Sequence, residues 1–416
     1  MRSLLKLAFI VFAAFAAVLP ASAQNIRIAV LEGLSGPFAN VGEHWMSEFR
    51  FAVDQVNANG GVLNGRKLEI VPLDNKGSAQ ESLIQLRNAT NQGIQFIFQG
   101  TSSAIAAALI DAVEKNNTRN PAAQVVFLNY SAIDMPLTNE GCSYWHFRFD
   151  ANIDMKVRAL IGELAADKSI KKVYLINQDY SLGQTVSKSA AAFLKAERPD
   201  IEIVGNDFHP IGQVKDFVPY IAKIQASGAQ VVITSSWGND MLNLIKAGNA
   251  LGLKLSWYTF YAGAFGAPTA LGDASAGRVK VVSEYHNNIA SNGVAAWDAA
   301  YRAKTGSDFL FQRARLSILM LASAINKAKS TEAKEVARAL EGMKFDGGLG
   351  MVEMRAGDHQ LLQPLFVYTL EKTAARGGPK EAAIELEGSG LGSVTTKRFD
   401  AQQTALPHSC VMKRPS

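Results

Sequence analysis

The fold follows from the stretch IEIVGNDFHPIGQVKDFVPYIAKIQASGAQVVITSSWGNDMLNLIKAGNA, residues 201–250. Two short apolar runs, residues 201–208 and 230–236, alternate with two segments, residues 217–226 and 240–250, whose apolar residues recur at helical spacing. Strands that alternate with helices of about ten to fifteen residues form βαβ units and therefore parallel sheets. The stretch thus predicts part of a doubly wound α/β domain.

The same alternation extends over most of the chain in two successive series. Further strands are predicted at residues 26–31, 67–74, 94–100, 124–130, 173–179, 255–261 and 279–285. Further helices are predicted at residues 44–57, 79–92, 183–196 and 312–329, and one that begins at residue 102. The sequence therefore predicts an α/β protein of two Rossmann-like lobes, in which ligands bind beyond the carboxyl ends of the strands.

The N-terminus has the pattern of a secretory signal peptide. A short basic start precedes the apolar run LAFIVFAAFAAVL (residues 7–19), and small residues follow at Ala21-Ser22-Ala23. A membrane anchor is the alternative, but this run falls short of the roughly 20 apolar residues that span a bilayer. We expect cleavage after Ala23 and export to the periplasm, without a lipid anchor because no cysteine stands near the cleavage site.

Composition and charge are those of an ordinary soluble protein. The chain has 416 residues, 48% of them hydrophobic and 19% charged, and is long enough for two cores. The net charge of +5 is spread along the chain, so no nucleic-acid partner is expected. Cys142 and Cys410 are the two cysteines; in an exported chain a disulfide between them is favoured over two free thiols.

Motifs for catalysis, metals and cofactors are missing from the sequence. It contains no G-x-G-x-x-G after a strand, no G-x-x-x-x-G-K-[ST], no H-E-x-x-H and no C-x-x-C. The segment Gly33-Leu34-Ser35-Gly36-Pro37 approaches a nucleophile elbow, but Pro37 stands where that motif requires glycine. We expect no metal, no cofactor and no enzyme; a periplasmic hydrolase is the rival class, since an α/β fold with Ser and His can transfer acyl groups.

Hydroxyl residues follow two predicted strands of the first series. Thr101, Ser102 and Ser103 connect a strand to a helix of small residues, where free N–H groups and the helix dipole attract anions. Plain N-capping by serine is the alternative interpretation. Ser131 and Ala132 follow the next strand and can offer polar groups to the same ligand.

Aromatic residues lie at predicted strand ends of the second series. They are Tyr180, Trp237, Tyr258, Phe260 and Tyr261. Each alone is more often a core residue than a ligand contact, but aromatic side chains at one edge of a lobe give a cleft a large apolar contact area. This clustering indicates a ligand with an aromatic or apolar body.

From residue 25 to residue 370 the chain resembles the periplasmic leucine/isoleucine/valine-binding proteins, which have the type I periplasmic binding protein fold. The ordered segments that carry the resemblance are IRIAVLEGLSGPFANVG (26–42), DQVNANGGVLNGRKLEIVPLDN (54–75), GTSSA (100–104), NQDYSLGQ (177–184), KDFVPYIAKIQASGAQVVI (215–233) and GNDMLNLIKAGNALGL (238–253). CSYWHFRFDAN (142–152) and RAGDHQLLQPLFVY (355–368) resemble a proteobacterial branch that includes binders of aromatic acids.

The resemblance implies two lobes joined by three hinge strands, which close on the ligand. We expect the first lobe to hold residues 24–148 and 284–354, and the second lobe residues 149–283 and 355–416. The implied partners are a small-molecule ligand and the membrane permease of an ABC importer; a sensing role for a receptor would use the same fold. A monomer is expected.

The resemblance also implies roles for site residues. Ser102, Ser103, Ser131 and Ala132 would hold a ligand carboxylate, and Tyr180 and Trp237 would close from the second lobe. Thr101 and Tyr261 are further candidate ligand contacts. The position of the acidic residue that accepts an α-ammonium is Ala262, and a tyrosine of the first loop is replaced by Val41. Asp150 or Asp154 could supply an acid instead, or could be helix caps. A carboxylate with an aromatic or apolar body is therefore preferred over a branched-chain amino acid.

Overall fold

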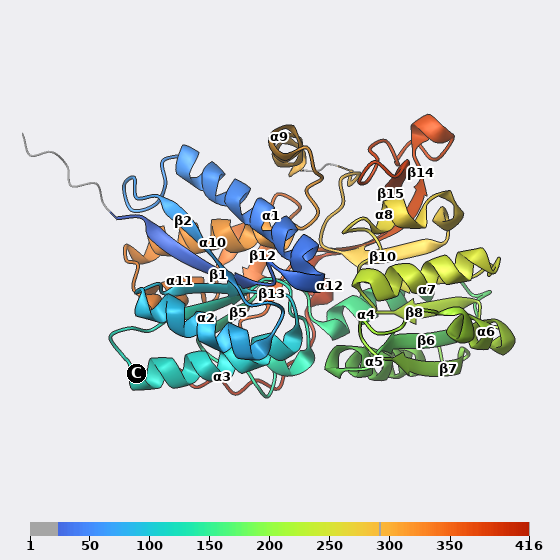
Figure 1. Ribbon diagram of the computed structural model, residues 1–416, viewed down its shortest axis with the longest axis horizontal. Helices are drawn as coiled ribbons and strands as arrows, with labels where there is room; N and C mark the ends of the chain where they lie inside the picture. The colour runs from blue at the N-terminus through green and yellow to red at the C-terminus, as the bar shows by residue number, and fades with distance from the viewer. Residues whose placement is uncertain (1–23, 291–292, 416) are drawn as a thin grey trace, which may run out of the picture.

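The computed structural model describes residues 24–290 and 293–415, which form two α/β lobes side by side (Figure 1). The predicted signal peptide, residues 1–23, lies outside the described residues. The first lobe has a five-stranded parallel sheet in the order β2-β1-β3-β4-β5. Its strands are β1 (Ile26–Glu32), β2 (Leu68–Asp74), β3 (Phe96–Gln99), β4 (Val126–Asn129) and β5 (His146–Arg148). The predicted α/β fold is confirmed.

Helices from both halves of the sequence cover this sheet. They are α1 (Ala39–Ala58), α2 (Ala79–Asn91), α3 (Ser103–Arg119), α10 (Gln312–Ala328) and α11 (Ala333–Leu340). A small antiparallel sheet adds β11 (Lys344–Asp346), β12 (Met351–Met354) and β13 (Leu361–Leu362). Because α10 packs on α1, a segment more than 250 residues away along the chain reaches the first lobe.

The second lobe has a seven-stranded sheet in the order β15-β14-β10-β9-β8-β6-β7. The strands β6 (Lys172–Gln178), β7 (Glu202–His209), β8 (Val231–Thr234), β9 (Ser256–Thr259) and β10 (Val279–Ser283) are parallel, while β14 (Leu365–Lys372) and β15 (Leu391–Phe399) are antiparallel to their neighbours. One face packs on α4 (Ile153–Leu164) and α5 (Ser181–Glu197). The other face packs on α6 (Val218–Ser227), α7 (Gly238–Ala250) and α8 (Ala267–Leu271).

The chain passes between the lobes after β5, after β10 and between β13 and β14. The second passage leads into α9 (Ala295–Thr305), and α12 (Ala401–Thr404) follows β15. The tail after α12 returns to the first lobe, where the C-terminus lies near α3 (Figure 1). There Arg414 Nε donates to Glu341 Oε1 at 2.8 Å. The lobe boundaries stay a proposal. The pairing of β13 with β12 and the packing of Leu361 in the first core favour moving residues 355–362 to the first lobe, and the Arg414 contact favours moving residues 405–415.

Cys142 and Cys410 are joined as a disulfide, with Cα atoms 5.8 Å apart and a sequence separation of 268. In the loop-entropy description, so long a loop restricts the unfolded chain by about 5 kcal/mol. Cys410→Ala together with Cys142→Ala is therefore expected to lower the free energy of unfolding by a few kcal/mol, measured by urea denaturation. Reduction of the wild type should give the same loss, and an unchanged unfolding midpoint would contradict the prediction.

Candidate ligand-binding site

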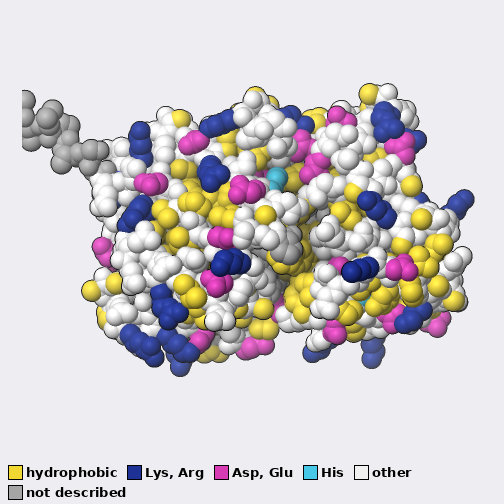
Figure 2. All heavy atoms as spheres, viewed as in Figure 1, with side chains coloured by type: hydrophobic (Ala, Val, Ile, Leu, Met, Phe, Trp, Pro, Cys, Tyr) yellow, Lys and Arg dark blue, Asp and Glu magenta, His cyan; other side chains and the backbone are white. Residues whose placement is uncertain are grey.

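A cavity lies between the lobes, at the carboxyl ends of strands from both sheets. It has about 570 Å³ of empty space, part of it open to solvent, which suits a small molecule. Figure 2 shows the furrow between the two halves, with hydrophobic side chains in its floor. The lining residues are Val41, Trp45, Gly100, Thr101, Ser102, Ser103, Ser131, Ala132, Ile133, Tyr180, Leu182, Trp237, Gly238, Tyr261, Phe265 and Arg313.

The hydroxyl loop between β3 and α3 forms one wall. Ser102 has the positive φ of 87°, an uncommon conformation for a residue with a side chain. Its side chain makes no capping hydrogen bond, so it leaves the first-turn N–H groups of α3 without a side-chain cap. Ser103 Oγ accepts a hydrogen bond from the N–H of Asp134 at 3.2 Å. Ser102 therefore does not act as an ordinary side-chain N-cap, and the first-turn N–H groups of α3 lie beside the cavity.

A buried carboxylate, Glu32 at the end of β1, holds this loop from below. Its Oε1 accepts from the N–H groups of Gly100 at 2.9 Å and Thr101 at 3.0 Å, and from the hydroxyl of Tyr130. Burial raises the pKa of Glu32 against these hydrogen bonds. The first two amides of the loop are therefore occupied, which leaves the α3 amides after Ser102 for a ligand. Glu32 was not predicted as a site residue, although a charged residue at the end of an apolar strand is a visible signal in the sequence.

The loop after β4, which contains Ser131 and Ala132, offers its side chains to the cavity rather than free backbone N–H groups. The N–H groups of Ser131 and Ala132 donate to Asn129 Oδ1 at 3.2 and 2.7 Å, so they are already used. The hydroxyl of Ser131 accepts from Arg313 Nη2 at 3.4 Å. Ser131 therefore places its hydroxyl beside Arg313, a cation that was not predicted from the sequence.

The second lobe supplies aromatic walls. Trp237 Nε1 donates to the hydroxyl of Tyr180 at 2.9 Å, and the Trp237 ring packs on Phe38 of the first lobe with centroids 5.1 Å apart. Phe265 also crosses to the first lobe, where it packs on Phe311 at 5.3 Å. These contacts bring aromatic side chains of the second lobe against the first lobe at the cavity. Of the predicted aromatic residues, Tyr180, Trp237 and Tyr261 line the cavity, whereas Tyr258 and Phe260 are core residues that do not.

Four buried charges form a cluster that meets the cavity through Arg313. Arg313, at the start of α10, places Nη1 2.6 Å from Glu284 and Nε 3.4 Å from Asp150, whose other oxygen is 2.9 Å from Lys156. Each of the four is 2% exposed or less. Burial lowers the pKa of Arg313, but Asp150 and Glu284 outweigh burial and raise it, so the guanidinium is charged. The cluster balances two cations with two carboxylates.

Three further sequence predictions concern acidic positions. Ala262 is fully buried and does not line the cavity. Asp150 does not line it either and reaches it through Arg313. Asp154 stands in the first turn of α4, where its carboxylate accepts from the hydroxyl of Ser189. Among the described lining residues there is no Asp or Glu.

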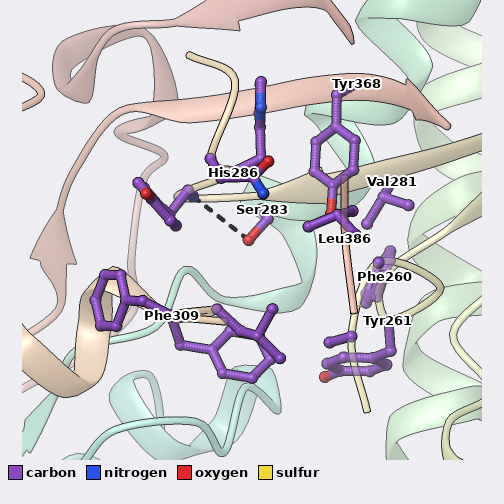
Figure 3. Close-up of a pocket in the computed structure, with 14 residues that line it drawn as sticks. Phe260, Tyr261, Val281, Ser283, His286, Phe309, Tyr368 and Leu386 are labelled. Atoms are coloured by element: carbon purple, nitrogen blue, oxygen red, sulfur yellow. Dashed lines mark hydrogen bonds between the residues drawn. The ribbon is translucent and has the colours of Figure 1, made fainter. Parts of the chain in front are cut away.

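A second, smaller hollow lies behind Tyr261, which lines both spaces. Figure 3 shows Tyr261 and Phe260 on one side of it and His286, Ser283 and Tyr368 on the other. Burial lowers the pKa of His286 to about 3, so this imidazole is neutral. The hollow has about 330 Å³ of empty space and lies beside β10, where the chain crosses between the lobes. Both apolar and polar side chains line it.

Ser236, His209 and Asp240 bear on the rival hydrolase hypothesis. Ser236 Oγ is 3.0 Å from His209 Nε2, and His209 Nδ1 is 3.9 Å from Asp240. All three are buried and none lines the cavity, and Asp240 accepts instead from Gln178 at 2.8 Å and from the N–H of Gly212 at 2.7 Å. With the base too far from its orienting acid and the hydroxyl out of reach of a ligand, the group is a structural network.

The described part of the chain has neither a metal-ligand cluster nor a helix that could span a membrane. Within residues 24–290 and 293–415, no group of three or more His, Cys, Asp or Glu side chains is placed to hold a metal ion. Over the same ranges, no helix combines the length and apolar character needed to cross a membrane.

Comparison with known proteins agrees with this fold. A periplasmic binding protein family model matches residues 25–377. Leu/Ile/Val-binding protein homolog 4 of Brucella abortus is 32% identical over 407 residues, 95% of this chain and 94% of that one. The closed crystal structure of a leucine-, isoleucine-, valine-, threonine- and alanine-binding protein from Brucella ovis has a TM-score of 0.85 at 30% identity, and covers 94% of this chain and 100% of the other.

A Rhodopseudomonas palustris solute-binding protein of an ABC transporter, crystallised with benzoate, has a TM-score of 0.74 at 18% identity and covers 89% of this chain and 95% of its own; that likeness concerns the fold alone. The family match spans most of the chain, and the relatives above extend over nearly all of it. The chain belongs to the periplasmic binding protein family.

Proposed function

We propose that this protein captures a small carboxylate with an aromatic or apolar body and delivers it to the permease of an ABC importer. The observation that carries the proposal is the character of the cavity. Hydroxyls, uncapped helix amides, Arg313 and several aromatic rings line it, and no described lining residue is acidic. An α-ammonium would therefore lie in the cavity without a carboxylate partner, which is costly when buried.

A branched-chain amino acid is the second candidate ligand. It is favoured by the Brucella ovis relative, whose name includes leucine, isoleucine and valine as ligands. Asp150 and Glu284 could serve its ammonium only by giving up contacts with Arg313 and Lys156. The proposal includes a periplasmic location after signal cleavage, no lipid anchor and no catalytic activity; a sensing role would use the same binding chemistry.

A thermal-shift screen tests the ligand class. The panel contains leucine, isoleucine and valine, benzoate, 4-hydroxybenzoate and cinnamate, aliphatic diacids, and 4-methylpentanoate as leucine without its ammonium. A ligand that binds only the folded protein raises the melting temperature by mass action. We expect shifts with the aromatic acids and a larger shift with 4-methylpentanoate than with leucine. A strong shift with leucine and none with aromatic acids would overturn the proposed class.

Ser102→Ala separates ligand binding from helix capping. Because the Ser102 side chain makes no capping hydrogen bond, we expect the free energy of unfolding to stay within about 0.5 kcal/mol of wild type. Affinity for a carboxylate should fall by about tenfold or more, the worth of a hydrogen bond to a charged group. Calorimetric titration and urea unfolding measure the two quantities.

Ser78→Ala is the matched control, because Ser78 Oγ does cap α2 by accepting from the N–H of Glu81. That variant should lose about 1 kcal/mol of stability and keep its affinity. If Ser102→Ala behaves like Ser78→Ala, the hydroxyl loop is only a helix cap.

A further inference from the structure

We propose that Arg313 is the ligand's carboxylate-binding cation and that Glu284 sets how strongly it binds. This inference rests on the proposed function, because it concerns the same cavity, and it assigns the charge recognition there to one side chain. Neither the strand-end rule nor the hydroxyl loop leads to Arg313, since it comes from the first turn of α10, far along the chain.

Arg313 is buried yet has hydrogen-bond donors to spare. Its side chain is 1% exposed and lines the cavity between Trp45 and Ser131. A guanidinium has five N–H donors. Nη1 donates to Glu284 at 2.6 Å and Nη2 makes a long contact of 3.4 Å with Ser131 Oγ, while Nε makes no hydrogen bond. The Nη2 edge is therefore the underused face of a planar fork that suits a carboxylate.

The surrounding residues hold this guanidinium in place before a ligand arrives. Its central carbon lies 4.0 Å from the centroid of the Phe311 ring and 5.0 Å from that of Trp45, and these two rings stack on each other, so together they support the guanidinium. Glu284 follows β10 and Asp150 follows β5, so residues at two of the passages between the lobes contact the same cation, Arg313. A positioned donor binds an anion with little further loss of conformational freedom.

Charge balance explains why Glu284 would tune the affinity. Within the cluster, Asp150 and Glu284 offset the charges of Arg313 and Lys156. A ligand carboxylate must compete with Glu284 for the field of Arg313, and like charges at short range in a buried site oppose each other. Glutamine at position 284 keeps an acceptor for Nη1 but removes the competing charge.

The test compares a carboxylate with its neutral amide. Dissociation constants of benzoate and benzamide are measured by calorimetric titration for wild type, Arg313→Met and Arg315→Met; leucine and leucinamide form a second pair. We expect Arg313→Met to weaken benzoate by about 10- to 150-fold and benzamide much less, so that the preference for the anion collapses. Arg315, on the same helix, stacks on Trp297 and does not line the cavity, so its variant should keep the preference within about threefold.

Glu284→Gln gives a test in the opposite direction, which still applies if Arg313→Met does not fold. It should raise the ratio of benzoate to benzamide affinity by about tenfold. An equal loss of both ligands in Arg313→Met, or an unchanged ratio in Glu284→Gln, overturns the assignment while the proposed function stands. If leucine binds and benzoate does not, the proposed ligand class fails, and the leucine pair decides on Arg313. If neither carboxylate binds the wild type, both proposals fall.

Discussion

Lys156→Met is expected to lower the free energy of unfolding by about 3–5 kcal/mol at pH 8. Lys156 is 1% exposed and its Nζ lies 2.9 Å from Oδ1 of Asp150, which is itself fully buried. Burial raises the pKa of Asp150, while Arg313 and Lys156 lower it. Methionine fills a similar volume but leaves that carboxylate with Arg313 alone, at 3.4 Å. The loss is therefore that of an uncompensated buried charge, measured by urea unfolding.

The pH dependence of this deficit identifies its cause. Without Lys156 the folded-state pKa of Asp150 rises further, so the folded variant gains a proton as the pH falls, and below that pKa the penalty disappears. The deficit should thus be largest at pH 8 and shrink towards pH 5. Lys304→Met is the matched control, because Lys304 and Asp54 form an ion pair in which both side chains are more than half exposed. It should cost less than about 1 kcal/mol; equal losses in the two variants would refute the explanation.

The strands and helices of the two parallel series could be predicted because their signals are local. Residues 201–250 contain β7, α6, β8 and α7 close to the predicted places, since each apolar run or helical stripe packs on the sheet next to it. β14 and β15 were not predicted. They pair antiparallel to each other across an irregular segment and extend the second sheet at its edge, and no βα alternation announces that pairing.

The residues of the candidate site likewise fall into those that could be predicted from local sequence signals and those that could not. Ser102, Ser103, Ser131, Tyr180 and Trp237 could be placed at the cavity because the ends of parallel strands meet at one edge of a sheet. Arg313 and Phe265 could not, since their places depend on how distant elements pack. α10 reaches the cavity by packing on α1, and Phe265 does so through a left-handed backbone, with φ of 56°.

Position 262, where the resemblance implies an acidic residue, shows the limit of such a prediction. A resemblance fixes a sequence position but not the direction of its side chain. Tyr261 lines the cavity, and the next residue, Ala262, is packed in the core with Trp257, Leu271 and Tyr368. The absence of an acidic residue at position 262 is therefore weaker evidence against an amino-acid ligand than the family resemblance implied. The lining of the cavity itself carries that argument.

Ala262→Asp tests this conclusion, and we expect it to cost about 4 kcal/mol of unfolding free energy at pH 7 without creating affinity for leucine. Ala262 is 0% exposed among apolar side chains, so a carboxyl there has a raised folded-state pKa and ionises at the expense of stability. The loss should shrink as the pH falls to 5, where the folded protein keeps the proton. Urea unfolding at both pH values and a thermal-shift assay with leucine provide the measurements. Ala222→Asp, at an exposed site on α6, should change stability by less than about 1 kcal/mol. A stable Ala262→Asp variant that binds leucine would place position 262 in the ligand site after all.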